Sequence, residues 1–138
     1  MEPLPPITVV LADDQRAYRE GLARAIAGHN RLELVAVARD GAEALAAIES
    51  LEPDVALVDV RMAGMHGTTL CGELRRRHPG LGTRVVLMSA QDAPLLSEHA
   101  GADGFVAKDR SRREICEALV SVSRRGRPAA VLAPVQPG

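Results

Sequence analysis

Residues 7–14 read ITVVLADD, a run of apolar and β-branched residues that ends in two acids. A run of this length and composition predicts a buried β-strand with Asp13 and Asp14 at its carboxyl end. Three further apolar runs end in the same way, with a polar residue directly after the run: Asp59 after 55–58, Ser89 after 84–88 and Lys108 after 104–107. The sequence therefore predicts several strands whose carboxyl ends carry polar groups.

Segments with helical periodicity alternate with these strands. The predicted strands are 7–12, 32–38, 54–58, 84–88 and 104–107, and the predicted helices are 15–28, 41–50, 68–77, 93–99 and a last one that begins after Ser111. Two of the helices have a capping box at their start, Asp40 with Glu43 and Ser111 with Glu114. Five strand–helix units in alternation predict an α/β fold, in which helices cover both faces of a parallel sheet.

The composition indicates one domain with an aliphatic core and little overall charge. The chain has 138 residues and a formal net charge of −1, and Tyr18 and Phe105 are its aromatic residues. A near-neutral chain has no general attraction to nucleic acid or to a membrane surface, and no apolar run reaches the length of a membrane span. Cys71 and Cys116 lack metal-site spacing, and the start of the chain lacks a signal-peptide pattern. We therefore expect reduced thiols in a cytoplasmic protein.

The character of the chain changes after Gly126. Residues 127–138 contain prolines and show neither helical nor strand periodicity, which predicts a tail or an interdomain linker. Residues 1–126 are then expected to form the folded domain.

The polar residues at the strand ends form a candidate site. In an open parallel sheet, ligands bind beyond the carboxyl ends of the strands. The residues expected at this edge are Asp13, Asp14, Asp59, Ser89 and Lys108. Clustered carboxylates repel each other and need a counter-charge, which a hard divalent cation such as Mg²⁺ supplies. One carboxylate can then attack phosphorus as a nucleophile, while Mg²⁺ and Lys108 neutralise the phosphoryl oxygens and Ser89 donates a hydrogen bond.

Each of these residues has a simpler explanation when it is taken alone. The pair Asp13-Asp14 is typical of a solvated turn or a helix cap, and a lysine such as Lys108 can be a surface charge at a strand edge. Lys108 is, however, the only lysine among 17 basic residues. Polar groups at four strand ends of one sheet favour the functional interpretation.

Four segments of the chain resemble the receiver domain of two-component response regulators: VLADD at 10–14, LVDVRM at 57–62, VLMSA at 86–90 and GADGFVAK at 101–108. The resemblance covers residues 7–125. It implies a flavodoxin-like five-stranded sheet in strand order 2-1-3-4-5, and a phosphoryl group that Asp59 accepts from a sensor histidine kinase. The other roles that it implies are Mg²⁺ binding by Asp13, Asp14, Asp59 and the carbonyl of Arg61, phosphoryl contact by Lys108, and a switch pair formed by Ser89 and Phe105.

Two departures from the family pattern bear on function. The loop at 62–66 reads MAGMH, where the family usually has proline in place of Ala63 and an acid in place of His66, and losing proline gives the loop more freedom. Lys108 is followed by Asp109, which resembles the NarL/FixJ-like subgroup with a helix-turn-helix output domain. The resemblance thus implies transcription control through an output domain absent from this chain, and a homodimer formed on activation. No direct DNA contact is expected from this chain.

Two other functions stay open at this point. A receiver can dock to its partner without phosphate, and the altered loop keeps that alternative in view. A Mg²⁺-dependent phosphohydrolase places its nucleophile after the first strand in the form Asp-x-Asp, whereas this chain has Asp13-Asp14-Gln15. We expect the chain not to be an enzyme in the usual sense, because its chemistry would be limited to phosphorylation and dephosphorylation of its own acceptor.

Overall fold

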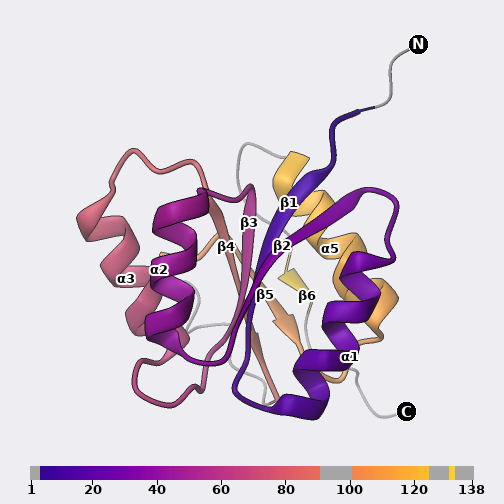
Figure 1. Ribbon diagram of the computed structural model, residues 1–138, viewed down its shortest axis with the longest axis horizontal. Coiled ribbons are helices and arrows are strands. Elements are labelled where there is room, and N and C mark those ends of the chain that lie inside the picture. Colours follow the sequence, from indigo (N-terminus) through magenta and orange to yellow (C-terminus); the bar gives the residue numbers. More distant parts are fainter. Residues whose placement is uncertain (1–3, 91–100, 125–130, 133–138) are drawn as a thin grey trace.

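A parallel sheet lies at the centre of the computed structural model, which describes residues 4–90, 101–124 and 131–132 (Figure 1). The strands of the described residues are β1 (Ile7–Ala12), β2 (Leu32–Ala38), β3 (Val55–Asp59), β4 (Arg84–Ser89), β5 (Gly104–Ala107) and β6 (Val131–Leu132). They are ordered β2-β1-β3-β4-β5-β6. The five strands predicted from the sequence are therefore present in the predicted order, and β6 extends the sheet beyond β5.

Helices pack on both faces of this sheet. Helices α1 (Arg16–Ala27) and α5 (Arg112–Arg124) lie on one side, and α2 (Gly41–Leu51) and α3 (Gly67–Arg77) lie on the other (Figure 1). Strand β1 shows why two cores form, since successive side chains of a strand point to opposite faces. Val9 and Leu11 belong to the core under α1 and α5, whereas Val10 and Ala12 belong to the core under α2 and α3.

Side-chain caps fix the start of two helices. The Asp40 carboxylate accepts from the Glu43 N–H at 2.9 Å, at the start of α2. At the start of α5, Ser111 Oγ accepts from the Glu114 N–H at 3.0 Å, and Glu114 Oε1 accepts from the Ser111 N–H at 3.1 Å. The predicted capping box of Ser111 and Glu114 is thus confirmed. At α2 the predicted Asp40 cap is present, but Glu43 Oε1 accepts from the Arg39 N–H rather than from the Asp40 N–H. An N-cap of this kind stabilises a helix by about 1 kcal/mol.

The structure differs from the predicted elements mainly at their ends. Asp59 and Ser89 are the last residues of β3 and β4 rather than the residues after them, because Asp59 still pairs with Met88 in the ladder. The helix predicted at 93–99 lies outside the described residues. Strand β6 lies within the predicted tail and pairs with β5 through its backbone, a pairing for which side-chain periodicity carries no signal. The domain boundary at residue 126 stays a prediction.

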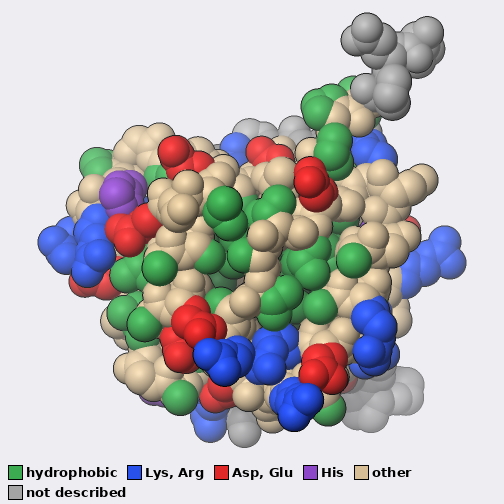
Figure 2. Space-filling model, viewed as in Figure 1, with side chains coloured by type: hydrophobic (Ala, Val, Ile, Leu, Met, Phe, Trp, Pro, Cys, Tyr) green, Lys and Arg blue, Asp and Glu red, His purple; other side chains and the backbone are tan. Residues whose placement is uncertain are grey.

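Strand β2 forms one edge of the sheet. Figure 2 shows hydrophobic side chains gathered in the middle of the face where Figure 1 places β2, and Val37 in this strand is 44% exposed. The register of β2 against β1 shifts between Val9 and Val10, which marks a bulge or irregularity. Such an interruption makes a strand edge a poorer template for pairing with another chain.

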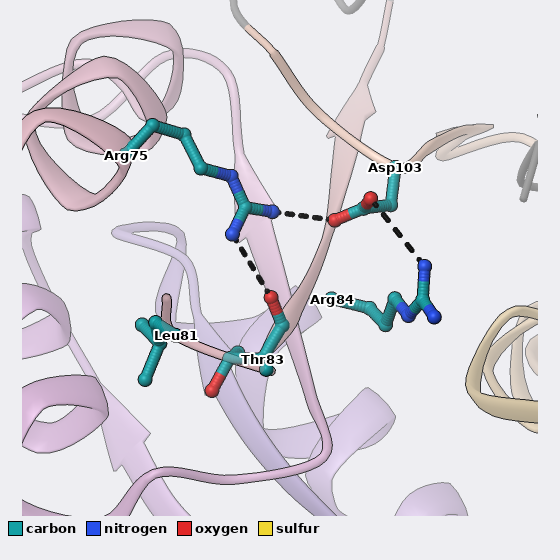
Figure 3. Close-up of a pocket in the computed structure, with 6 residues that line it drawn as sticks. Arg75, Leu81, Thr83, Arg84 and Asp103 are labelled. Atoms are coloured by element: carbon teal, nitrogen blue, oxygen red, sulfur yellow. Dashed lines mark hydrogen bonds and ion pairs between the residues drawn. The ribbon is translucent and has the colours of Figure 1, made fainter. Parts of the chain in front are cut away.

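An ion cluster ties the amino ends of β4 and β5 to α3. Asp103, directly before β5, is buried and pairs with Arg75 of α3 (Figure 3). Its Oδ2 also accepts from the Val85 N–H at 2.9 Å. Arg75 also donates to the Thr83 carbonyl at 3.2 Å, and Arg84 lies 3.8 Å from Asp103 Oδ1. We call Asp103, Arg75 and Arg84 the arginine cluster. It borders a hollow of about 140 Å³.

In the described part of the chain, no helix combines the length and apolar character needed to span a membrane.

Candidate functional site

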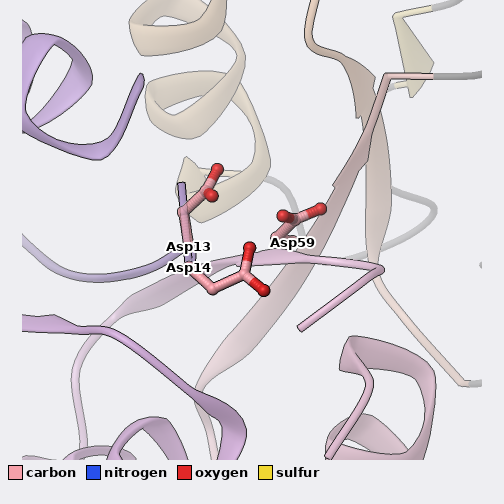
Figure 4. A group of neighbouring side chains, drawn as sticks. All are labelled: Asp13, Asp14 and Asp59. Carbon is pink, nitrogen blue, oxygen red and sulfur yellow. The ribbon is translucent and has the colours of Figure 1, made fainter. Parts of the chain in front are cut away.

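Three carboxylates meet at the carboxyl ends of β1 and β3. Asp13 and Asp14 follow β1 directly, Asp59 ends β3, and one oxygen of each lies within 4.8 Å of the others. Figure 4 shows the three side chains around a common space. Asp13 and Asp59 are buried, and Asp14 is exposed at the mouth of the site. The sequence-based prediction that these acids share one site is therefore correct in its geometry, and we call them the acidic cluster.

Backbone N–H groups hold one oxygen of each carboxylate. The Gln15 N–H donates to Asp13 Oδ1 at 2.8 Å, and the Arg61 N–H donates to Asp59 Oδ1 at 3.3 Å. Both are bonds from the residue two positions ahead, a turn that Asp commonly makes after a strand. Asp14 Oδ2 accepts from the Ala63 N–H at 3.2 Å, which connects two loops that lie 49 residues apart in the sequence. The carboxylates are thus oriented before any ligand binds.

Lys108 brings the counter-charge to the acidic cluster. Its Nζ lies 2.7 Å from Asp13 Oδ2 and 3.0 Å from Asp59 Oδ2, and the side chain is 9% exposed. The Lys108 N–H donates to the Ser89 carbonyl at 2.9 Å, which fixes the end of β5 beside β4. The predicted meeting of this lysine with the acids is present in the structure.

The acidic cluster carries more negative charge than Lys108 neutralises. Burial raises the pKa of the Asp59 carboxyl to about 6; the hydrogen bond from Lys108 opposes this rise and the Asp13 carboxylate adds to it. Asp13 Oδ2 is buried and, although it lies within ion-pair distance of Lys108, it makes no aligned hydrogen bond to any described residue. A hard cation with oxygen ligands fits such a donor set, because it supplies both charge and coordination. The residues present therefore fit Mg²⁺.

Arg61, the fourth predicted ligand, lies beside the acids. It is the second residue after β3, and its N–H is bound to Asp59. Its backbone is therefore close to the acidic cluster, and the ligand role of its carbonyl stays a prediction.

Ser89 and Phe105, the predicted switch pair, lie on neighbouring strands. Ser89 is 5% exposed at the end of β4, where it pairs with Ala107, the residue before Lys108. Phe105 is completely buried in the core under α2 and α3. The ring is thus already turned inward in this structure, and the role of the pair as a switch stays a prediction.

The loop after β3 is held tightly against the site. Gly67 begins α3, and a Cβ at this position would lie 2.4 Å from the Asp59 carbonyl oxygen, so the close approach requires glycine. The Gly67 N–H donates to the Val60 carbonyl at 2.9 Å. Together with the bond from Ala63 to Asp14, this contact restrains a loop that the loss of proline was expected to loosen.

Two further contacts of Lys108 were not predicted from the sequence. Gln15 is the N-cap residue of α1 but makes no side-chain cap bond, and its Oε1 accepts from Lys108 Nζ at 3.0 Å. The ring of Tyr18, in the first turn of α1, lies under the ammonium with 4.6 Å between Nζ and the ring centroid. The only sign of these contacts in the sequence is where the two residues lie. Gln15 directly follows the two acids, and Tyr18 lies four residues after Asp14, about one helical turn.

Comparison with known proteins identifies a family. A sequence model of the response regulator receiver domain matches residues 9–120. The protein named "Probable transcriptional regulatory protein NarL" of Mycobacterium tuberculosis is 41% identical over 121 residues, covering 86% of this chain and 55% of NarL. "Transcriptional regulatory protein LnrK" of Bacillus subtilis is 34% identical over 125 residues, covering 87% of this chain and 55% of LnrK. The chain thus spans about half the length of these curated relatives.

Solved structures agree with the sequence matches. The signal receiver domain of NarL from Mycobacterium tuberculosis superposes with a TM-score of 0.82 at 39% identity, covering 90% of this chain and all of that domain. A DNA-binding response regulator of the LuxR family from Staphylococcus aureus gives a TM-score of 0.78 at 28% identity, covering 85% of this chain and 98% of that one. The chain belongs to the response regulator receiver family, and its relatives are transcriptional response regulators of the NarL/LuxR type.

Proposed function

We propose that this chain is a phosphorylation-dependent switch in which Asp59 accepts a phosphoryl group in the presence of Mg²⁺. The observation that carries the proposal is the convergence of Asp13, Asp14 and Asp59 within 4.8 Å of one another, with the ammonium of Lys108 paired to Asp13 and Asp59. The proposed Mg²⁺ ligands are Asp13, Asp14, Asp59 and the carbonyl of Arg61. When bound, Mg²⁺ supplies the positive charge that lets a carboxylate and a phosphoryl group approach each other.

Asp59 is the carboxylate best suited to attack phosphorus. It lies at the centre of the strand order, its carboxylate has one oxygen on the Arg61 N–H and the other on Lys108, and its surroundings are buried. In the proposed step an Asp59 oxygen forms the new O–P bond while the N–P bond of a donor phosphohistidine breaks, and the imidazole keeps the electron pair of that bond. Lys108 then has a phosphoryl oxygen within its reach and stabilises the charge that develops there.

The phosphoryl group would change the partner surface through β4 and β5. Lys108 is joined to β4 by the bond from its N–H to the Ser89 carbonyl, so a change at the ammonium acts on the end of β4 that carries Ser89 and on β5, which carries Phe105. In the proposed switch the Ser89 hydroxyl turns to a phosphoryl oxygen and Phe105 stabilises the altered packing. The phosphoryl group shifts the equilibrium between the inactive and the active state by the difference between its interaction free energies with the two states.

The proposed partners follow from the family. A sensor histidine kinase donates the phosphoryl group, and a homodimer forms on activation. Because the relatives are transcriptional regulators and this chain covers only 55% of their length, we propose a DNA-binding output domain in the whole protein, at work in the cytoplasm.

The first test measures phosphate uptake. The full chain is incubated with acetyl phosphate, with and without Mg²⁺, and its intact mass is recorded. We expect one phosphate on the wild-type chain only when Mg²⁺ is present, and none on Asp59→Asn. Asp40→Asn is the matched control at the same edge of the sheet, because asparagine also caps a helix, and it should be phosphorylated normally.

Three outcomes would reject parts of this proposal. Absence of phosphate on the wild-type chain would favour docking without phosphate. Phosphate that persists on Asp59→Asn would reject the acceptor assignment. Multiple turnover of free phosphoesters would favour a phosphohydrolase.

A further inference from the structure

The only lysine of the chain lies against its only tyrosine. Lys108 Nζ is 4.6 Å from the centroid of the Tyr18 ring, and the Tyr18 hydroxyl donates to the Lys108 carbonyl at 3.5 Å. Tyr18 thus contacts both the ammonium and the backbone of the same lysine. We propose that Tyr18 is a positioning residue, which holds the Lys108 ammonium in the site while its oxygen partners change. The proposal deepens the proposed function and rests on it.

The need for such a residue follows from what Lys108 contacts. Its ammonium is bound to oxygens of Asp13, Asp59 and Gln15. Two of these three partners belong to the acidic cluster. A cation that enters the site competes with the ammonium for their oxygens, and phosphorylation of Asp59 replaces a carboxylate oxygen with phosphoryl oxygens. With Gln15 as its one described oxygen partner outside the acidic cluster, the ammonium would be able to swing out toward solvent on its flexible stem while its other partners change.

The Tyr18 ring offers an attraction that no entering ligand can displace. The face of an aromatic ring attracts a cation through its quadrupole and uses no oxygen to do so. The ring is itself held in place, since Tyr18 lies in the first turn of α1 and packs against the core under α1 and α5. Burial raises the pKa of the Tyr18 hydroxyl to about 12, so the hydroxyl stays protonated and keeps its bond to the Lys108 carbonyl.

A purely structural role for Tyr18 makes different predictions. If the side chain only fills space, leucine replaces it well, and any remaining effect is independent of Lys108. If it positions Lys108, phenylalanine replaces it well, leucine does not, and the effect disappears when Lys108 is absent. The variants Tyr18→Phe and Tyr18→Leu therefore separate the two roles.

The first experiment needs no phosphate. Because the chain has one lysine, labelling with ¹⁵N-lysine gives a single side-chain ammonium signal in NMR spectra of the full chain. We expect the ammonium protons of the wild type and of Tyr18→Phe to show the upfield shift caused by a ring face, and those of Tyr18→Leu to lose it. Equal shifts in the wild type and in Tyr18→Leu would overturn the proposal.

The second experiment is a double-mutant cycle on phosphorylation by acetyl phosphate with Mg²⁺. A partly desolvated cation–ring contact corresponds to roughly a three- to tenfold change in rate, so Tyr18→Leu should be slower than the wild type by that factor. Tyr18→Phe should stay within about twofold of the wild type, because it keeps the ring. In a Lys108→Met background, Tyr18→Leu should cause no further slowing.

The results separate this proposal from the one on which it rests. If the same slowing persists in the Lys108→Met background, Tyr18 acts through the fold and not through the lysine. If the wild-type chain takes up no phosphate, the proposed function fails, and the NMR comparison alone decides whether Tyr18 holds Lys108. Thermal unfolding of each variant checks that it is folded before either result is used.

Discussion

The acidic cluster and the arginine cluster occupy opposite ends of the sheet. Acids outnumber basic groups in the acidic cluster, whereas basic groups outnumber the acid in the arginine cluster. At the amino ends of β4 and β5, the buried acid Asp103 faces two arginines (Figure 3), and it also accepts a hydrogen bond from a backbone N–H. At the carboxyl ends of β1 and β3, three acids lie together (Figure 4), and the single ammonium of Lys108 pairs with two of them, Asp13 and Asp59. The first arrangement satisfies its buried acid with groups of the chain itself and stabilises the fold. The second leaves negative charge for a ligand, at a cost in stability.

The largest expected effect tests the arginine cluster. Asp103→Ala removes the acceptor of Arg75 and of the Val85 N–H, and we expect it to lower the free energy of unfolding by about 2–4 kcal/mol, measured by urea unfolding. This loss of stability is smaller than for a fully buried ion pair, because the Arg75 side chain is 29% exposed. Glu20→Gln is the matched control, since the pair Arg16–Glu20 is exposed, and it should change stability little. Equal effects of the two variants would show that the arginine cluster does not hold the fold.

The second prediction concerns the opposite end of the strands. In EDTA at pH 7, Asp59→Asn should raise the free energy of unfolding by about 1–2 kcal/mol, because it removes one carboxylate from a buried, repelling group. Asparagine still accepts a hydrogen bond from Lys108, so the gain reflects the lost charge. Destabilisation by this variant would contradict the view that the acidic cluster costs stability.

The same carboxyl gives a pH dependence with a definite sign. The pKa of Asp59 is raised in the folded chain, from its ordinary value of 3.8 to about 6. The protonated Asp59 carboxyl therefore stabilises the folded chain below pH 4, and this stabilisation is lost as the pH rises toward 6. The reason is that the unfolded chain releases this proton at a lower pH than the folded chain. In EDTA, the difference between the wild type and Asp59→Asn should widen over this range, and a constant difference would contradict the raised pKa.

Much of the fold follows from the sequence because its patterns are local. Strand runs and helical periods place the elements within a residue or two, and the acids after β1 and β3 must meet because the carboxyl ends of neighbouring parallel strands share an edge. The same rule places Lys108 at the acidic cluster. The chemical roles of these residues stay predictions, since geometry alone does not show a bound ion or a phosphate.

The features that were not predicted depend on contacts without a local pattern. Arg75 meets Asp103 across 28 residues of chain, and nothing in either segment indicates the partner. Tyr18 contacts Lys108 only because the first turn of α1 faces the end of β5. Strand β6 pairs through its backbone, which side-chain periodicity does not report.

A fourth prediction uses the charge difference between the acidic cluster and the arginine cluster. At a Mg²⁺ concentration ten times the dissociation constant, the wild-type chain should gain about 1.4 kcal/mol of stability by mass action, seen as a rise in Tm. Asp13→Asn should lose this gain, whereas Asp103→Asn, at the arginine cluster, should keep it. A gain that survives Asp13→Asn would place the ion elsewhere.

The smallest expected effect concerns Ala63. Its N–H donates to Asp14 Oδ2, a bond that proline at this position cannot make. Ala63→Pro should therefore free an oxygen of Asp14 and strengthen Mg²⁺ binding by roughly two- to threefold, as expected for an exposed hydrogen bond of about 0.5 kcal/mol. Ala63→Gly keeps the N–H and is the control in a Mg²⁺ titration followed by calorimetry. Weaker binding in Ala63→Pro would show that the bond helps to form the site.

The position of the phosphate tests the central claim most directly. The wild-type chain is treated with acetyl phosphate and Mg²⁺ and then with borohydride, which reduces an aspartyl phosphate to homoserine, and the digested peptides are sequenced by mass spectrometry. The account predicts homoserine in place of Asp59, and only in the sample that contained Mg²⁺. Homoserine in place of Asp13 or Asp14, or conversion of Asp59 without Mg²⁺, would contradict it.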